Sequence, residues 1–469
     1  MTLSPEGPRI VLDRTVRTFS NGSVLIGGVP GRMITLTPSG VESLAGLLDG
    51  GPHPPEAVRL EKRLIEAGMA HPCPPRTDVG PGSELGVTVV VPAHDRIAAL
   101  DRCLDALGRE TRVVVVDDAS ADPPGVAEVC ARHGAQLIVR ASNGGPGAAR
   151  NDAIAAIATD LVAFVDSDCT VTPGWLRGLV WLFDDPDIGA VAPRVRPDRS
   201  EPPIAASALA RFSDAHSALD MGPVAGEVGP ERAVRYLPAA ALVVRSTALA
   251  EGFDTRLRVG EDVDLVWRLL DEGWRIRYEP AVTVHHREPE SWPRLLGRRF
   301  RYGTSAGPLA VRHPDRLAPV ELRPWPTASV VAALAGHPWI AAALVATPAA
   351  SLARRLRPGG IPASLPLRWS AEGTGWTLVG VGHAATTLGG PLLMAGALRN
   401  RRWAALAALL VTLPPAVDWW KRRPNLDPLR WIGASVLDDL AYGAGVWVGC
   451  VRARSYRPLL PAIRWASTS

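Results

Sequence analysis

The sequence predicts an α/β protein in which a Rossmann-like, mostly parallel sheet lies between a small N-terminal α+β domain and a C-terminal hydrophobic helical region. Strand and helix patterns alternate from residue 87 onward, as in proteins with a parallel sheet. The strand patterns are continuous apolar runs, which is typical of strands buried on both faces. Long stretches without charged residues follow residue 323. The expected parts are a domain over 1–75, a linker over 76–86, the sheet domain over 87–315 and the helical region over 316–469.

Composition excludes several classes of protein. Of the 469 residues, 47% are hydrophobic and 21% are charged, so the chain can form a packed core and global disorder is not expected. The formal net charge is +4, and arginine greatly outnumbers lysine, which we attribute to a GC-rich genome rather than to nucleic-acid binding. The five cysteines form no CxxC pair, so we expect neither a zinc site nor a disulfide framework. The charged N-terminus does not have the apolar stretch of a secretion signal.

The N-terminal domain contains two strand patterns followed by two helix patterns. The strand patterns SVLIGG and RMITLT flank a Gly-Val-Pro-Gly turn. A helix is expected over 37–51, with Thr37 or Ser39 as its N-cap and Gly50 at its end. A second, amphipathic helix is expected over 54–71, and the Pro- and Gly-rich residues after it form the linker.

The sheet domain begins with four strand patterns separated by three helix patterns. The expected strands are 86–94, 112–120, 135–142 and 160–168, and the expected helices are 97–107, 124–134 and 147–158. This alternation predicts a parallel sheet with helices on both faces.

The C-terminal region contains two windows without Asp, Glu, Lys or Arg, between Arg323 and Arg354 and between Glu372 and Arg399. A bilayer span requires about 20 apolar residues, and both windows are long enough. Trp and Arg flank them, as at membrane interfaces. We expect this region to insert into a membrane or to associate tightly with one. The alternative is a set of Ala-rich buried helices in a soluble domain.

Polar residues lie at the ends of the predicted strands. Pro92 and Asp95 lie at the end of the first strand, Asp118 lies at the end of the second, and Asp166-Ser167-Asp168 ends the fourth. In an open parallel sheet, ligands bind beyond the carboxyl ends of the strands. Paired carboxylates suit Mg²⁺ or Mn²⁺, which keep coordination positions for phosphate oxygens. We therefore expect a site for a divalent cation at this edge.

Three further segments contain candidate functional residues. SNGGPGAARN, which includes Asn143 and Gly145, precedes a helix and offers backbone amides, although a plain strand-to-helix turn explains it equally well. Glu261 and Asp262 begin a helix, where they either cap the helix dipole or supply a general base. A later strand ends in His285-His286, a pair that could supply a metal ligand.

Residues 87 to about 290 resemble the family-2 glycosyltransferases of the GT-A fold. The motifs VVVPAHDR, VVVVDDAS, SNGGPGAARN, VDSD and GEDVDLVWRLLDEGWRIRYEP, with VHH, follow the order and spacing of that family. The resemblance implies a metal-dependent enzyme that transfers a sugar, with inversion, from a nucleotide-diphosphate donor. By this resemblance Asp118 hydrogen-bonds the nucleobase, with Pro92 and Asp95 lining the same pocket, and Arg150 lies near the donor phosphates.

The resemblance also implies roles in the metal site and in catalysis. Asp166 and Asp168 form a DxD motif in which Asp168 is the direct metal ligand. Asp262 is the base that deprotonates the acceptor hydroxyl, and Glu261 positions or assists it. Either His285 or His286 completes the metal shell.

The N-terminal and C-terminal parts of the chain indicate which kind of glycosyltransferase the sequence resembles. Residues 1–75 resemble the small winged-helix-like domains that bind a precursor peptide as an added strand. Nearly the whole chain resembles the glycosyltransferases of the mycofactocin system. This implies that a β-1,4-linked oligosaccharide is added to a peptide-derived redox cofactor, with UDP-glucose as the donor.

Two other functions fit parts of the sequence. One is a membrane-associated transferase for cell-envelope polysaccharide or a lipid-linked sugar, which would not explain the N-terminal domain. The other is a non-catalytic peptide-binding scaffold, against which the intact acidic motifs argue. We expect a cell-membrane location with the catalytic domain facing the cytoplasm, where nucleotide sugars are made.

Overall fold

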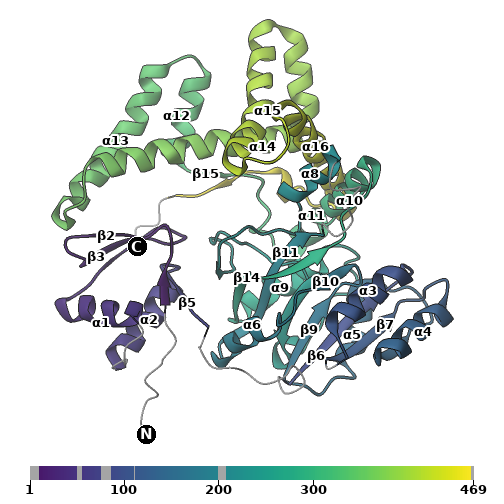
Figure 1. Cartoon of the computed structure of the whole chain (residues 1–469). Helices are drawn as coiled ribbons and strands as arrows, with labels where there is room; N and C mark the ends of the chain where they lie inside the picture. The colour runs from purple at the N-terminus through teal and green to yellow at the C-terminus, as the bar shows by residue number, and fades with distance from the viewer. Residues whose placement is uncertain (1–9, 50–54, 75–85, 110, 199–206, 466–469) are drawn as a thin grey trace. The chain divides into compact units, whose positions relative to one another are not determined.

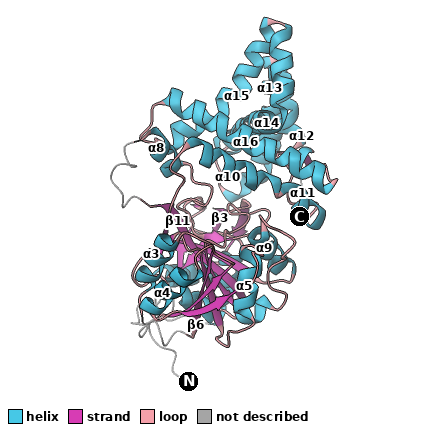
Figure 2. Cartoon of the chain, turned by 90° about the vertical axis from the view of Figure 1, so that its right-hand side faces the viewer, coloured by secondary structure: helices cyan, strands magenta, loops and turns pink. Residues whose placement is uncertain are grey.

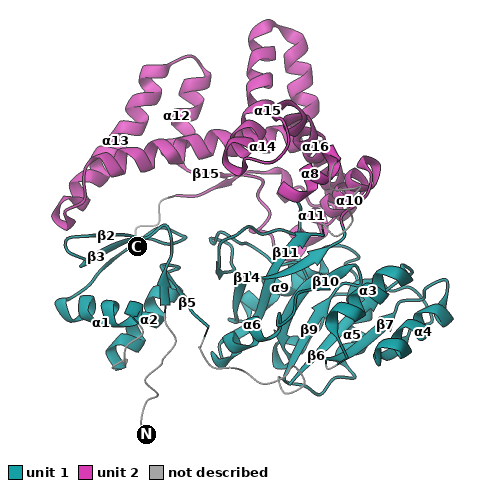
Figure 3. Cartoon of the chain, in the orientation of Figure 1, with its two compact units in different colours: residues 1–198, 217–287 teal, residues 199–216, 288–469 magenta. Residues whose placement is uncertain are grey.

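The computed structural model describes residues 10–49, 55–74, 86–109, 111–198 and 207–465. The chain divides into two units, shown in different colours in Figure 3. Unit 1 consists of residues 1–198 and 217–287, and unit 2 consists of residues 199–216 and 288–469. The expected domain boundaries at residues 75 and 315 stay predictions.

The N-terminal part of unit 1 is a small α+β domain with its own apolar core. Its elements are β1 (Ile10–Leu12), β2 (Arg17–Phe19), β3 (Val24–Gly27), β4 (Arg32–Thr35), α1 (Pro38–Asp49), α2 (Pro55–Glu66) and β5 (Ala70–Pro72). Strands β2, β3 and β4 form an antiparallel sheet, while β1 pairs with β5. The Thr37 hydroxyl accepts a hydrogen bond from the Gly40 amide at 3.2 Å, so Thr37 is the N-cap of α1.

The end of the second helix differs from the sequence prediction, and two predicted features lie outside the described residues. The second helix does not reach residue 71. It ends at Glu66, Gly68 adopts a φ of +66°, and the chain then forms β5. A left-handed glycine just after a helix commonly ends it, and this signal lay inside the predicted helix. Gly50 and residues 76–85 of the expected linker lie outside the described residues.

In the described part of the chain, a nine-stranded sheet forms the centre of unit 1. Its order is β10-β14-β11-β13-β9-β6-β7-β8, with β12 beside β14. The bounds are β6 (Val87–Ala93), β7 (Arg112–Asp117), β8 (Gln136–Val139), β9 (Leu161–Val165), β10 (Cys169–Val171), β11 (Ile188–Pro197), β12 (Gly226–Glu227), β13 (Ala241–Arg245) and β14 (Arg275–His286).

Most of these strands run in one direction. Strands β9, β6, β7 and β8 are parallel neighbours. Strands β11 and β14 share their direction, because β13 is antiparallel to both β9 and β11. Six of the nine strands therefore run the same way, and the predicted α/β fold with a mostly parallel sheet is confirmed.

Helices cover the sheet as the alternating sequence pattern predicts (Figures 1 and 2). Their bounds are α3 (Ile97–Leu107), α4 (Pro123–His133), α5 (Pro146–Ile154), α6 (Arg177–Val180) and α9 (Glu261–Asp271). The core between sheet and helices contains fully buried Val91, Val115, Val165 and Leu100. Burying an aliphatic side chain of this size contributes about 1.5–3 kcal/mol, so these strands gain stability from both faces.

Unit 2 is mainly helical. Its helices are α8 (Ala208–Ala215), α10 (Trp292–Thr304), α11 (Ala306–Arg312), α12 (Pro324–Leu334), α13 (Pro338–Leu356), α14 (Ser364–Arg399), α15 (Arg401–Arg422) and α16 (Pro428–Ala453). The two short strands β15 (Glu321–Leu322) and β16 (Ala462–Ile463) pair in parallel.

The two uncharged windows form different structures. The first is not a single membrane-length helix, because Gly336 has a φ of +85° and Pro338 starts a new helix, so α12 and α13 form a hairpin (Figure 1). The second lies inside the continuous helix α14. Among the described helices, α14 and α15 are long and apolar enough to cross a membrane, by length and composition alone.

Helices α10 and α11 pack against α16 through four glycines, here called the glycine seam: Gly303, Gly307, Gly445 and Gly449. Each pair has the GxxxG spacing that allows two helices to approach closely. A Cβ atom on Gly303 would lie 2.1 Å from the carbonyl oxygen of Tyr442, closer than any real contact. The helix backbones are therefore in direct contact at this seam.

Candidate active site

The polar residues that follow β6, β7 and β9 lie at one edge of the sheet. Ala93 and Asp117 are paired in register, so β6 and β7 end at the same level. The Asp166 amide, just after β9, donates to the carbonyl of Ala240 at 3.0 Å. Figure 1 shows β6, β7 and β9 side by side. Ligands of parallel sheets bind at such an edge.

The carboxylate of Asp118 organises the Gly-rich segment. It accepts hydrogen bonds from the amides of Gly144 at 2.8 Å and Gly145 at 2.7 Å, and it pairs with Arg140. The side chain of Asn143 donates to the carbonyl of Asp118 at 3.3 Å. Asp118 is buried, so in this structure its carboxylate shapes the turn before α5 rather than pointing into solvent.

Asp95 connects the turns after β6 and β7. Its amide donates to the Ser120 hydroxyl at 2.8 Å, and its carboxylate accepts from the Ala121 amide at 2.9 Å. The half-buried Pro92 is paired in register with Val116 of β7. Pro92, Asp95 and Asp118 therefore lie on neighbouring strand ends, as the sequence predicted.

Three arginines at this edge escaped the sequence analysis: Arg96, Arg140 and Arg258. Arg96 donates to a carboxylate oxygen of Asp168 at 2.7 Å, and its side chain is 69% exposed. Arg258 donates to the side-chain oxygen of Asn143 at 2.8 Å. Their positions could have drawn attention, since Arg96 ends the VVVPAHDR motif and Arg258 lies three residues before Glu261. Exposed guanidinium groups suit the recognition of phosphate oxygens.

Arg150 is buried between two of the predicted site carboxylates. Its guanidinium donates to Glu261 at 2.9 Å and to Asp166 at 2.7 Å, and it lies over the Phe253 ring at 5.1 Å. Its side chain is 3% exposed. The structure therefore places Arg150 as a link between the DxD segment and the start of α9.

Burial affects both carboxylates that Arg150 holds. Burial, with the neighbouring charge of Asp262, raises the pKa of Glu261 to about 7, against the opposing effect of Arg150. Burial likewise raises the pKa of Asp166, and the nearby Arg150 opposes the increase.

The strand register distinguishes between the two histidines. Cys169 of β10 is opposite His286 of β14, and Thr170 is opposite His285. Because successive side chains point to opposite faces of a strand, only one histidine can face Asp168. The ring Nε2 of His286 lies 3.5 Å from a carboxylate oxygen of Asp168, so the structure brings His286 to the DxD motif.

The described residues contain no preassembled group of three or more His, Cys, Asp or Glu side chains for a metal ion. Asp168 pairs with Arg96 instead. The carboxylates of Asp166 and Asp168 are nevertheless oxygen donors of the kind that Mg²⁺ and Mn²⁺ prefer. The chemistry of the donors fits a divalent cation.

Asp262 differs from Glu261 in accessibility. Gly260, with a φ of +84°, precedes α9 and places both carboxylates in its first turn. Glu261 is 6% exposed and held by Arg150, whereas Asp262 is only half-buried. One oxygen of Asp262 accepts from the amide of Ala239 at 3.2 Å and the other from Val263 at 2.8 Å. Asp262 is thus an oriented carboxylate that stays partly exposed to solvent.

Comparisons with known proteins identify the family of this chain. Residues 88–236 match the family model of glycosyl transferase family 2. Two strains of Mycobacterium tuberculosis have a pre-mycofactocin glycosyltransferase that is 36% identical to this chain over 99% of both chains. The succinoglycan biosynthesis protein ExoO of Rhizobium meliloti is 29% identical over 48% of this chain and 66% of its own length.

Among solved structures, a mannosyltransferase from Pyrobaculum calidifontis, in complex with GDP-Man and Mn²⁺, is 20% identical. The match covers 76% of this chain and 89% of that one, with a TM-score of 0.42.

A mostly parallel sheet with acidic motifs at one edge, matched by a family-2 model, defines a glycosyltransferase. The similarity to the pre-mycofactocin glycosyltransferases over 99% of both chains identifies the group of glycosyltransferases. The chain belongs to the family-2 glycosyltransferases of the mycofactocin system.

Proposed function

We propose that the protein is an inverting hexosyltransferase that moves glucose from UDP-glucose to the mycofactocin precursor and builds a β-1,4-linked oligosaccharide. The relatives named pre-mycofactocin glycosyltransferase support the acceptor, because the likeness extends over 99% of both chains. The observation that carries the mechanism is the contrast between the buried, paired Glu261 and the accessible Asp262.

In this mechanism Asp262 removes the proton from the acceptor hydroxyl. Inversion by a single displacement requires one base on the acceptor side and a stabilised leaving group on the opposite side. The amide of Ala239 orients the Asp262 carboxylate while leaving it able to accept a proton. A positioned base of this kind contributes about 10²–10⁴-fold to the rate. Glu261 acts indirectly, through its bond to Arg150.

On the donor side, Pro92, Asp95 and Asp118 border the pocket assigned to the nucleobase. The Asp118 carboxylate already accepts from Gly144, Gly145 and Arg140, so direct contact with a base requires it to give up one of these partners. Asn143 and Gly145 offer polar groups at the start of α5, where a helix N-terminus favours phosphate. Arg150 holds Asp166 in place from behind rather than contacting the phosphates itself.

A divalent cation, Mg²⁺ or Mn²⁺, completes the proposed site. Asp168, Asp166 and His286 would hold it, and His285 is turned to the other face of β14. When bound, such a cation offsets the negative charge that develops on the leaving diphosphate. Asp168 must then release Arg96, whose exposed side chain is free to turn toward the donor phosphates.

Two further parts of the proposal concern partners. We assign a precursor peptide to the N-terminal domain, as an added strand beside its three-stranded sheet. We also assign the helices of unit 2 to the cell membrane, with the catalytic domain facing the cytoplasm. Helices α14 and α15 are long and apolar enough to cross it, and Trp339, Leu392 and Leu398 are 86%, 79% and 84% exposed.

A transfer assay followed by mass spectrometry tests the proposal. The full-length protein, with Mg²⁺ or Mn²⁺, is given a panel of nucleotide sugars and either the peptide-derived cofactor or lipid-phosphate acceptors. Successive hexose additions to the cofactor, with UDP-glucose as the best donor, are expected. Transfer to lipid phosphates alone would refute the proposal that mycofactocin is the acceptor. It would favour a function in cell-envelope synthesis, with which the similarity to a succinoglycan biosynthesis protein is compatible.

A further inference from the structure

One segment of unit 1 runs from the N-terminal domain to the acidic motifs of the active site. It extends from β12 at Gly226 to Ala240, just before β13. Val228 pairs with Val234 as an isolated bridge, and the amide of Gly229 donates to the Val234 carbonyl at 3.0 Å. The bridge is parallel, so residues 228–234 form a short closed loop, which is followed by the approach to β13. Arg232 lies in this loop, where its amide donates to the Gly229 carbonyl at 3.1 Å.

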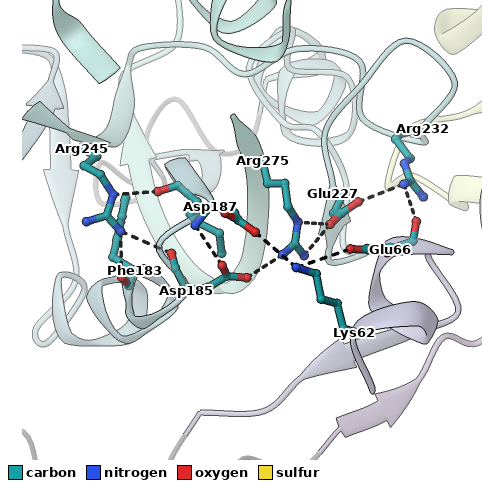
Figure 4. Close-up of polar contacts among 10 residues, drawn as sticks. Lys62, Glu66, Phe183, Asp185, Asp187, Glu227, Arg232, Arg245 and Arg275 are labelled. Carbon is teal, nitrogen blue, oxygen red and sulfur yellow. Dashed lines mark hydrogen bonds and ion pairs between the residues drawn. The ribbon is translucent and has the colours of Figure 1, made fainter. Parts of the chain in front are cut away.

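Arg232 joins this loop to the N-terminal domain (Figure 4). Its guanidinium donates to the Val29 carbonyl at 2.9 Å and to the Glu66 carbonyl at 2.7 Å. These acceptors are the β3–β4 turn and the last residue of α2. Gly68 leaves room for this contact, because a Cβ there would meet the Arg232 guanidinium at 2.9 Å. A single side chain therefore binds two separate backbone sites of the N-terminal domain.

The near end of the segment is fixed to the sheet. Glu227 accepts from Arg232 at 2.9 Å and from Arg275 of β14 at 2.7 and 2.9 Å (Figure 4). Arg275 also donates to Asp185 at 2.6 Å. Glu227 is 10% exposed in this network, and largely buried, paired charges of this kind hold their geometry better than surface pairs do.

The far end of the segment contacts the active-site carboxylates. The indole of Trp267 in α9 donates to the Arg235 carbonyl at 3.0 Å. The Ala239 amide donates to Asp262 at 3.2 Å, and the Ala240 carbonyl accepts from the Asp166 amide at 3.0 Å. Ala240, which binds the DxD segment, thus lies eight positions after Arg232, which contacts the N-terminal domain.

Burial makes this stretch stiff. Leu237 and Ala239 are fully buried, and Val228 and Val234 are 3% and 6% exposed. Protein interiors are close-packed and transmit small displacements rather than absorbing them. A shift of the loop at Arg232 is therefore expected to reach the Ala239 amide.

We propose that Arg232 is a positioning residue, which couples the docking of the N-terminal domain to the orientation of Asp262. The inference rests on the proposed role of Asp262 as the base. In this view the domain expected to bind a peptide also sets the alignment of the acceptor side of the active site. Its docked position is part of the catalytic arrangement.

Arg232→Ala and Lys62→Ala, in the full-length protein, form a matched pair for the test. Lys62 also joins the N-terminal domain to the sheet domain, through Asp187 at 3.4 Å, and pairs with the Glu66 carboxylate at 4.0 Å, but neither partner belongs to the segment 226–240 (Figure 4). For Arg232→Ala we expect kcat to fall about 10- to 100-fold with the KM for UDP-glucose unchanged, as displacement of a catalytic group does. Lys62→Ala is expected to keep the wild-type kcat.

Hydrogen exchange gives a second readout that does not depend on sugar transfer. Peptides covering residues 233–240 should exchange faster in Arg232→Ala, and not in Lys62→Ala, because the Ala239 amide loses its fixed partner. Arg232→Lys keeps the charge beside Glu227 but cannot reach both carbonyls, so it should be intermediate in both readouts.

The outcomes separate this inference from the proposed function. Unchanged kcat and unchanged exchange in Arg232→Ala would overturn the coupling, as would an equal loss in Lys62→Ala. A parallel loss of UDP affinity would show general damage and would also overturn it. If the wild-type protein transfers no sugar to any acceptor, the proposed function fails, and the exchange data alone then decide whether Arg232 controls the segment.

Discussion

Replacing Arg150 with methionine should destabilise unit 1 in a pH-dependent way. The substitution keeps the approximate length of the side chain but leaves Glu261 and Asp166 without the guanidinium that each contacts below 3 Å. Removing one partner of a buried ion pair costs about 3–5 kcal/mol. Because Asp166 is about one-third exposed and Glu261 can take up a proton, we expect the lower end of that range, about 3 kcal/mol, at about pH 8.

The pH dependence follows from Glu261. Its pKa is already raised to about 7, so near pH 6 the carboxyl is mostly protonated and needs its cation less. The penalty of Arg150→Met should therefore be smaller near pH 6 than near pH 8. Adding Glu261→Gln to Arg150→Met should recover part of the loss, because groups in contact are not additive.

Thermal unfolding of the two variants, measured beside Arg140→Met, gives the assay. Arg140 also pairs with two carboxylates, but its side chain is 19% exposed and Asp118 keeps the amides of Gly144 and Gly145. For Arg150→Met, a loss of about 3 kcal/mol corresponds to a Tm decrease of about 6–12 °C in a domain of this size. For Arg140→Met we expect a Tm decrease about one-third as large. Equal decreases for the two arginine variants at both pH values would refute the reasoning from buried charge.

Four other predictions follow from the same structure. Asp262→Asn should lower sugar transfer by about 10²–10⁴-fold while UDP still raises the Tm, and near wild-type turnover would exclude Asp262 as the base. Asp168→Ala, or removal of divalent cations with a chelator, should weaken UDP binding measured by calorimetry; UDP affinity that chelation does not change would contradict the proposed cation site. Because the pKa of Glu261 is raised to about 7 in the folded protein, its contribution to the free energy of unfolding is fully present below its ordinary pKa and is lost as the pH rises through about 7. Glu261→Gln should therefore flatten the plot of Tm against pH across that interval, and an unchanged slope would be inconsistent with the raised pKa. Gly303→Ala should lower the Tm because its Cβ would meet backbone, whereas Gly433→Ala on α16 has open space and should leave the Tm unchanged or raise it slightly, so similar effects would argue against the seam.

Much of the sheet domain could be predicted from sequence, because its strands are long apolar runs with polar residues at their ends. The runs that became β6, β7 and β9 have the continuous Val-rich pattern of strands buried on both faces. Their carboxyl ends necessarily meet at one edge of a parallel sheet, so Asp95, Asp118 and Asp166 could be grouped in advance.

Features that depend on tertiary pairing could not be predicted in this way. Nothing local in Ala241–Arg245 says that β13 inserts antiparallel between β9 and β11. The choice of His286 over His285 required the register of β10 with β14. Charge partners were equally hidden, because Arg150 and Glu261 lie 111 residues apart in the chain.

The glycine seam also has a consequence for how this protein could vary through evolution. Helices α10 and α11 meet α16 backbone to backbone, yet four helices, α12 to α15, are inserted in the chain between these partners. The contact depends on four residues without side chains, so a larger residue at any of the four would separate the helix backbones. Helices α14 and α15 also contact α16, since Trp447 donates to the Leu388 carbonyl and Trp431 to the Pro415 carbonyl, so we expect variation in length within the α12–α13 hairpin rather than throughout residues 324–422.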